Sequence, residues 1–157
     1  MAQIHCPELP KGLGFPETGT LFFFYDCKQQ FGEYGERARV VYTGEPLPDM
    51  PRTRTVPRRG YDDSCQTFIK PEQYESFASD VLEMGGYEAN HQMLGYPLWI
   101  QRDETPEDRV LLLQIDSDTT LNPEWMWGDA GRIYFLISPA ALAAKDFDQT
   151  ELECECY

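Results

Sequence analysis

The chain has 157 residues, the length of one domain with a core of its own. Apolar residues make up 41% of it and aromatic residues 13%, which excludes a disordered chain. The net charge is −14, and all of it lies in residues 71–157, which hold eighteen acidic and four basic side chains. A field of this sign repels nucleic acid and anionic membranes and attracts basic partners. We therefore expect no nucleic-acid or membrane partner.

The expected location is the cytoplasm. No apolar run approaches the roughly 18 residues that a membrane helix needs. The first ten residues, MAQIHCPELP, lack the charged start and the apolar stretch of a secretory signal. The five cysteines are odd in number and scattered, which is typical of reduced thiols rather than a disulfide framework.

The first half is predicted to consist mostly of strands. Thr20–Asp26 (TLFFFYD) is too apolar to have one face in water, which indicates a central strand with Phe23 in the core. The short β-branched run Ala38–Thr43 is predicted to pair beside it. Residues 44–60 carry four prolines and four arginines, so we expect an irregular or extended segment there.

Two helices are predicted. The first begins at Pro71, presents Tyr74, Phe77 and Val81 at helical spacing, and ends at Gly85-Gly86. The second is short: Ser138 is its expected cap, Pro139 occupies its first turn, and it runs to Lys145.

The second half also contains strands. Arg109–Ile115 and Arg132–Ile137 are apolar. The tail Glu151–Tyr157 (ELECECY) alternates, which predicts a half-buried strand with the cysteines on the core side and the glutamates in water. Cys154 and Cys156 are closer together in sequence than paired zinc ligands, so we expect core thiols and no metal.

One pattern occurs twice. Gln3-Ile4, a loop, Gly19 and an apolar strand are matched by Gln114-Ile115, a loop, Gly131 and an apolar strand. Repetition of this kind predicts an internal strand–loop–strand duplication. The predicted fold is therefore α+β, a sheet-rich single domain over residues 1–157 with mainly antiparallel strands and two short helices.

No residue pattern predicts catalysis or a cofactor. Asp116-Ser117-Asp118 begins like a calcium loop, but Leu121 stands where the loop glycine belongs and Trp127 where the glutamate belongs. Asp and Ser side chains that cap a turn explain the run better. His91 has no recognisable nucleophile motif beside it and is expected to be a structural hydrogen-bonding residue.

The sequence leaves two further hypotheses, one about a tryptophan pair and one about a ligand cleft. Trp125 and Trp127 either plug the end of the core or form an exposed contact. Polar side chains also follow buried strands in the second half, and a cleft there, near His91, Gln114, Asp116 and Asp118, would suit a small ligand or a substrate.

Three motifs carry a family resemblance: His91–Pro97 (HQMLGYP), Leu111–Asp118 (LLLQIDSD) and Met126–Phe135 (MWGDAGRIYF). They resemble the signature of the DUF1963, or YwqG-like, family over nearly the whole chain. The resemblance implies a sheet-rich α+β fold and no established catalytic residues. Family members usually carry a segment before the first Gln-Ile strand, so the first repeat is expected to be truncated at its N-terminus.

The resemblance also implies a function. Members often occur in bacterial loci for polymorphic secreted toxins, where small acidic proteins act as immunity factors. We therefore expect a non-catalytic immunity-type protein that neutralises a basic toxin domain by direct binding. The expected contact residues are exposed acids and aromatics of one region: Asp116, Asp118, Glu124, Trp125, Trp127 and Asp129. The alternatives are a small-ligand-binding or enzymatic domain that uses the cleft near His91, Asp116 and Asp118, and a scaffold without a toxin.

Overall fold

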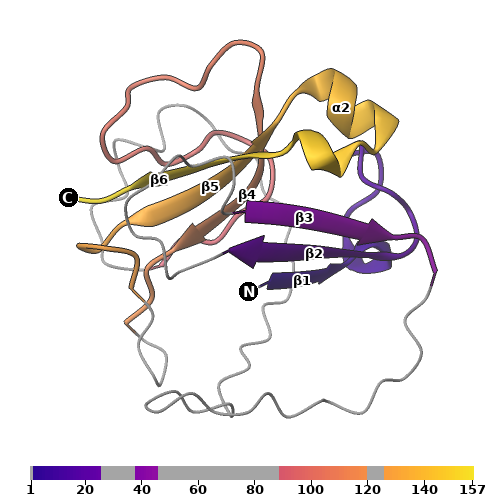
Figure 1. The fold of residues 1–157 in the computed structure, drawn as a ribbon, viewed down its shortest axis with the longest axis horizontal. Helices are drawn as coiled ribbons and strands as arrows, with labels where there is room; N and C mark the ends of the chain where they lie inside the picture. The colour runs from indigo at the N-terminus through magenta and orange to yellow at the C-terminus, as the bar shows by residue number, and fades with distance from the viewer. Residues whose placement is uncertain (1, 26–37, 46–88, 120–125) are drawn as a thin grey trace.

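The fold consists of two three-stranded antiparallel sheets, seen in a computed structural model that describes residues 2–25, 38–45, 89–119 and 126–157 (Figure 1). The first sheet, sheet A, has the order β1-β2-β3, with β1 at Ala2–His5, β2 at Thr20–Tyr25 and β3 at Ala38–Thr43. The second, sheet B, has the order β4-β5-β6, with β4 at Val110–Asp116, β5 at Arg132–Ile137 and β6 at Glu151–Glu155. A short helix, α2, spans Pro139–Ala144, and 3-10 turns lie at Cys6–Glu8 and Phe147–Gln149.

The strands predicted from local sequence are confirmed. β2 is the central strand of sheet A and β3 pairs beside it. β4 and β6 match the predicted apolar run and alternating tail to within a few residues. Ser138 caps α2, because its side chain accepts a hydrogen bond from the N–H of Ala141. The helix predicted from Pro71 lies outside the described residues, so one of the two predicted helices is observed.

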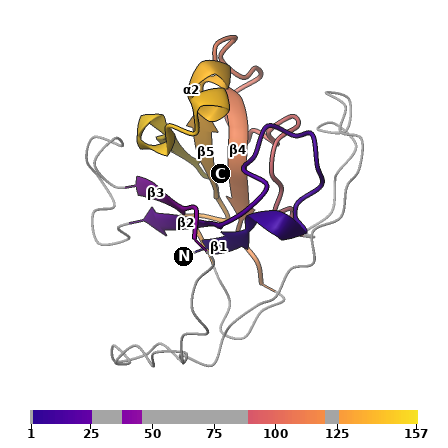
Figure 2. The same ribbon diagram turned by 90° about the vertical axis from the view of Figure 1, so that its right-hand side faces the viewer.

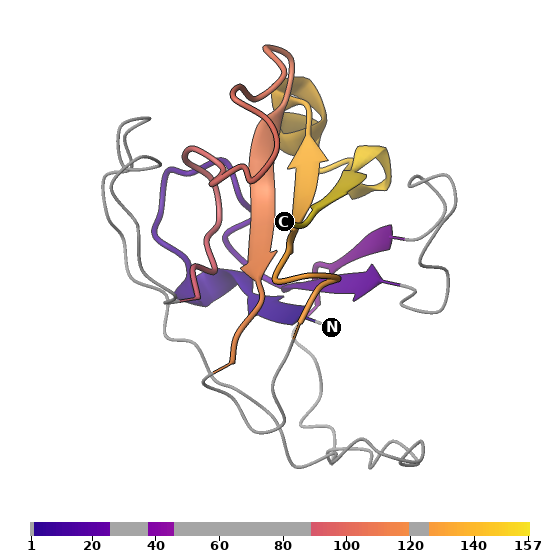
Figure 3. The same ribbon diagram turned by 90° about the vertical axis from the view of Figure 1, so that its left-hand side faces the viewer.

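The core lies where the inner faces of the two sheets meet, and the strands of one sheet cross those of the other (Figures 2 and 3). Phe23, fully buried as predicted, meets Phe135 of β5 edge to face with ring centroids 5.1 Å apart. Tyr42 of β3 contacts Phe147 at 5.8 Å. Aromatic contacts of this kind add to the burial energy that holds the two sheets together.

Sheet B is buried on its outer face too. Trp99 lies against Tyr134, with ring centroids 4.3 Å apart, and the two form a second cluster with Leu111 and Leu136. The residues around Trp99, 97–109, therefore cover the outer face of sheet B. The prediction that Glu155 points into water from β6 was wrong. Its side chain is 5% exposed, because residues 97–109 lie over it.

The two sheets share their local register. Gln3 pairs with Phe22 and Gln114 with Tyr134; His5 pairs with Thr20 and Asp116 with Arg132. The N–H of Cys6 donates to Gly19 O, and that of Ser117 donates to Gly131 O, over 3.0 and 3.2 Å. The residues that the sequence pattern placed in correspondence thus occupy corresponding positions in the two sheets.

None of the helices in the described ranges is both long enough and apolar enough to cross a membrane.

Candidate functional site

The residues predicted to line a ligand cleft, His91, Gln114 and Asp116, lie together. Gln92 forms an isolated antiparallel bridge with Gln114: its N–H donates to Gln114 O over 3.2 Å, and the N–H of Gln114 donates to Gln92 O over 2.8 Å. This bridge places residues 90–94 along the edge of β4. As a result, the N–H of Asp116 donates to Nδ1 of His91 over 3.1 Å.

The Gln114 side chain joins two segments of the main chain. Its Oε1 accepts from the N–H of Leu98 and its Nε2 donates to the carbonyl oxygen of Asn90, both over 2.9 Å. Gln114 is fully buried, and an amide buried without such partners would destabilise the fold. The amide therefore helps to hold residues 97–109 in place over sheet B. We call these residues the covering segment.

The Asp116 carboxylate is likewise bonded to other parts of the chain. It is 5% exposed, and Nε of Arg132 lies 2.8 Å from its Oδ2, an ion pair in which the Nε–H is not aligned for a hydrogen bond. The N–H of Asn90 donates to the same oxygen over 3.1 Å. Arg132 in turn donates from Nη1 to Leu98 O over 2.8 Å. A buried charge of this kind needs its pairing to remain in the fold.

His91 has the structural hydrogen-bonding role expected of it. Because Nδ1 accepts the main-chain N–H of Asp116, we assign the proton of the neutral ring to Nε2. Nε2 lies 3.6 Å from Oδ2 of Asp118, and the two side chains are 20% and 10% exposed. The nearby hydroxyl of Ser117 donates to Gly131 O and accepts from the N–H of Trp127, so it fastens the β4–β5 connection.

Of the residues predicted to bind a partner, the structure describes four, and two of these are buried. Asp116 and Asp118 were expected to be exposed, but they are 5% and 8% exposed. Trp127 is half-buried and meets Tyr25 of β2 edge to face at 5.5 Å, as a core plug would. Asp129 is exposed, and Glu124 and Trp125 lie outside the described residues. Their assignment to partner binding stays a prediction.

Exposed carboxylates gather on a different surface of the second half. We call it the acidic face; its carboxylates come from the covering segment and from β6. They are Asp103, Glu104, Glu107, Asp108 and Glu151, all exposed, and the half-buried Glu153. The two arginines of the covering segment, Arg102 and Arg109, connect it to β6. Arg109 donates to Glu151 over 2.6 Å, and Arg102 lies 3.1 Å from Glu153.

The sequence contained a signal for this surface. Residues 101–109 (QRDETPEDR) are almost entirely polar and contain a proline, which predicts an exposed turn. The contacts of Arg102 with Glu153 and of Arg109 with Glu151, 42 residues further along, place that turn beside β6. A local sequence pattern does not show that two segments so far apart in the chain lie side by side.

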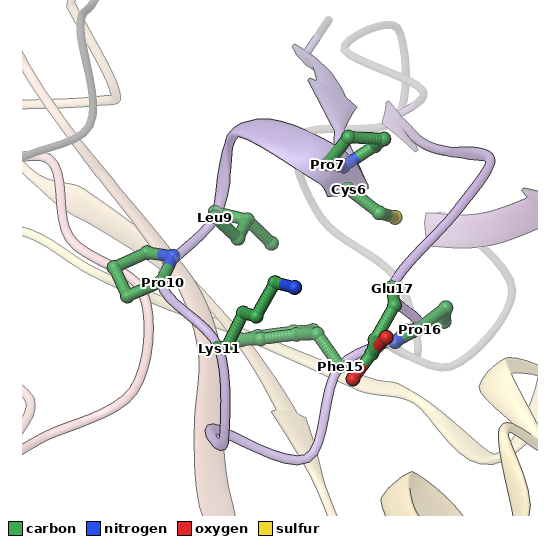
Figure 4. A pocket seen from close by; sticks show the side chains of 8 residues that line it. All are labelled: Cys6, Pro7, Leu9, Pro10, Lys11, Phe15, Pro16 and Glu17. Carbon is green, nitrogen blue, oxygen red and sulfur yellow. The ribbon is translucent and has the colours of Figure 1, made fainter.

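A small pocket lies in the β1–β2 connection, where residues 6–17 curve around it (Figure 4). Its cavity of about 20 Å³ has room for about one water molecule. The thiol of Cys6 is beside it, and burial raises the pKa of that thiol above its usual value. A buried thiol of raised pKa is a poor nucleophile.

Thiols and carboxylates do not gather into a metal site anywhere in the four described ranges. Cys6, Cys154 and Cys156, the cysteines of those ranges, are not joined in disulfides.

Among protein-family models, that of a domain of unknown function, DUF1963, matches residues 1–156 of the chain. A search among curated proteins found no match. The match covers essentially the whole chain, and the motifs that carried the resemblance form the β4 edge, the buried polar network and β5. The chain therefore belongs to the DUF1963 family.

Proposed function

We propose that the protein is a non-catalytic binding protein of the immunity type, which neutralises a cognate secreted bacterial toxin by direct contact. The observation that supports this most directly is the acidic face, with five exposed carboxylates from the covering segment and β6. Exposed charge of one sign speeds the approach of a basic partner and selects against acidic ones. We place its action in the cytoplasm, in keeping with cysteines that form no disulfide among the described residues.

The acidic face is also built to keep its shape. Glu155 accepts hydrogen bonds from the N–H groups of Ile100 and Gln101 over 2.8 and 2.9 Å, and Gln114 holds Leu98. These bonds fix the main chain that carries the carboxylates before a partner arrives. A preorganised surface loses less conformational entropy on binding.

The test uses the association rate of the protein with a basic toxin domain encoded beside its gene. A triple variant, Asp103→Asn, Glu104→Gln and Glu107→Gln, leaves both arginine contacts of the acidic face intact. At low salt, we expect its association rate to fall about fivefold or more below that of the unchanged protein. At high salt the difference should disappear, because screening removes the long-range attraction.

A matched control neutralises three exposed acids of the first half, Glu8, Glu17 and Glu45, each to glutamine. This variant has the same net charge as the test variant, so it isolates the effect of position. Equal slowing by both variants would mean that net charge alone is responsible. Failure of the toxin to bind the unchanged protein would reject the immunity function.

The alternative, a ligand-binding or enzymatic domain near His91, Asp116 and Asp118, has less support. The polar atoms of Gln114 and Asp116 bond to the chain's own main chain and to Arg132, which leaves few of them for a ligand. This alternative would gain support from a small molecule that raises the melting temperature and shifts the NMR signals of His91 and Asp118.

We also infer that sheets A and B derive from one duplicated unit. The shared strand order supports this, as do the matching pairs Gln3–Phe22 and Gln114–Tyr134. The two glycines support it further, because a Cβ at Gly19 would overlap Thr43 O and one at Gly131 would overlap Glu155 O. Each of these oxygens belongs to the residue that pairs with the residue after the glycine.

A further inference from the structure

We propose that the outer edge of β1 and the outer face of β2 form a docking site for an extended segment of a second protein. The segment carries an apolar or aromatic side chain and a carboxylate. This site is separate from the acidic face and goes beyond the binding function proposed above. Its chemistry follows from the way the chain covers the corresponding surface of sheet B.

The edge of β1 offers main-chain hydrogen bonds. The bond from the N–H of Cys6 to Gly19 O fixes the alternation along the ladder, so Ala2 and Ile4 are the residues that bond to β2. The N–H and C=O groups of Gln3 and His5 therefore point away from β2. Within the described part of the chain, β1 is the last strand of sheet A on this side.

In sheet B the same groups are paired. The alternation set by the Ser117–Gly131 bond turns the main chain of Gln114 and Asp116 outward from β5. There, Gln114 exchanges two hydrogen bonds with Gln92, and Asp116 donates to His91. The chain thus adds an extended segment to the edge of β4, which is the β-augmentation mode of peptide recognition.

The outer faces differ in the same way. Tyr134 and Leu136 of β5 are 0% and 1% exposed, because Trp99 and its neighbours cover them. Phe22 and Phe24 stand at the corresponding positions of β2, with stacked rings 6.4 Å apart, and Phe24 is 50% exposed. An apolar side chain placed over Phe22 and Phe24 would bury them as Trp99 buries Tyr134.

Charge specifies the occupant further. Leu136 pairs with Glu151, and Glu151 accepts a hydrogen bond from Arg109 of the covering segment. At the corresponding position of sheet A, Phe24 pairs with the exposed Arg39. The sign is reversed, so the segment that covers sheet A should carry a carboxylate where residues 97–109 carry Arg109.

Two stretches outside the described residues have sequence patterns that do not fit this site. Residues 46–60 include four arginines, which Arg39 would repel. Residues 71–84 have helical spacing, and a helix cannot pair with the edge of a strand because its main-chain groups bond to one another. Residues 26–37 and 61–70 do carry carboxylates and aromatic side chains. We assign the segment to another protein, and the hydrogen-exchange experiment below tests the chain's own residues as the alternative occupant.

The test uses a synthetic 22-residue peptide that copies residues 88–109 of the chain, with Arg109→Glu as the one change. Added to the isotope-labelled full chain, it should shift the amide NMR signals of Gln3, His5, Phe22 and Phe24. The signals of Gln114 and Tyr134 should stay in place, because the chain already covers that site. The unchanged peptide, which ends in arginine, should bind about two- to fivefold more weakly.

Three variants of the chain sharpen the test. Gln3→Pro removes one outward N–H without touching a bond to β2, so it should weaken peptide binding, whereas Gln3→Ala keeps that N–H and should weaken it less. Arg39→Glu should reverse the preference between the two peptides. Melting temperatures check that each variant remains folded.

Several results would overturn the proposal: no shifts at millimolar peptide, shifts elsewhere in the chain, or a preference that Arg39→Glu does not reverse. Amide hydrogen exchange in the free chain tests the other occupants. Protection of Gln3 and His5 as strong as that of Ile4 would mean that the chain's own residues cover the edge. Protection that rises with concentration would indicate a second copy. Gln3→Pro leaves the acidic face intact, so toxin binding is tested independently.

Discussion

At the scale of single residues, buried polar side chains bond to main-chain atoms. The Tyr134 hydroxyl donates to Leu98 O over 2.9 Å, beside the bond from Arg132 to the same oxygen. Burial raises the pKa of Tyr134 well above its ordinary value of about 10, because the ionised phenolate would lose its water there. The neutral phenol is therefore the form that the fold stabilises.

The free energy of unfolding should therefore depend on pH through Tyr134. In the unfolded chain Tyr134 ionises near pH 10, while in the folded chain it keeps its proton to higher pH, so its contribution to stability is complete below pH 10 and is lost above it. Between pH 10 and 11.5, the free energy of unfolding should fall faster than in Tyr134→Phe, by about 1.4 kcal/mol per pH unit.

The measurement is urea unfolding of both proteins across that range. At neutral pH, Tyr134→Phe should be less stable by about 1 kcal/mol, the loss of one hydrogen bond. The gap should then close as the pH rises and change sign before pH 11.5, because the expected loss over this range exceeds about 1 kcal/mol. The other tyrosines cancel in the comparison. A gap that stays constant to pH 11.5 would show that the folded state does not hold the Tyr134 proton.

At the scale of elements, each sheet depends on one glycine where a loop enters its central strand. Gly19 and Gly131 should tolerate no side chain, because a Cβ would overlap a neighbouring carbonyl oxygen at either position. Gly19→Ala and Gly131→Ala should each lower the free energy of unfolding by about 3 kcal/mol or more. The alanine at 19 is also strained by the φ of +83°.

Gly44→Ala is the matched control. The nearest atom to its Cβ would be the Tyr42 hydroxyl oxygen at 3.5 Å, an ordinary contact, so we expect a change within about 0.5 kcal/mol. Chemical denaturation of the three variants measures all of these values. A small effect at only one of positions 19 and 131 would contradict the proposed equivalence of the two sheets.

Local patterns predicted the elements well. The apolar run of β2 and the Ser138-Pro139 start of α2 act within a few residues, so they can be read directly from the sequence. The burial of Glu155 and Asp116 could not be predicted in this way. It arises because Ile100 N–H and Arg132 lie against them, and these contacts join distant parts of the chain.

The candidate site was also predicted only in part: its residues were recognised from the sequence, but their contacts were not. The polar residues His91, Gln114 and Asp116 were recognised from the sequence, but their commitment to main-chain partners depends on the Gln92–Gln114 bridge. The exposure expected of Asp116 and Asp118 was wrong for that reason. The acidic turn at residues 101–108 is readable as an exposed loop, whereas its position beside β6 is not.

At the scale of the whole molecule, stability depends on the contact between the two sheets. Phe23 is fully buried against Phe135, so Phe23→Ala should lower the free energy of unfolding by about 3–5 kcal/mol. Phe24→Ala, next to it on β2 and half exposed, should cost less than about 1 kcal/mol. Urea unfolding compares them, and similar losses would mean that Phe23 does not join the sheets.

The way the covering segment is fastened has a consequence for its divergence. Gln114 and Glu155 bind the main chain of Leu98, Ile100 and Gln101, and every amino acid except proline supplies the N–H groups they need. The outward side chains at 103, 104 and 107 are therefore not what fastens the segment. A lineage can therefore change the charge and shape of this surface while the main chain beneath it stays in place.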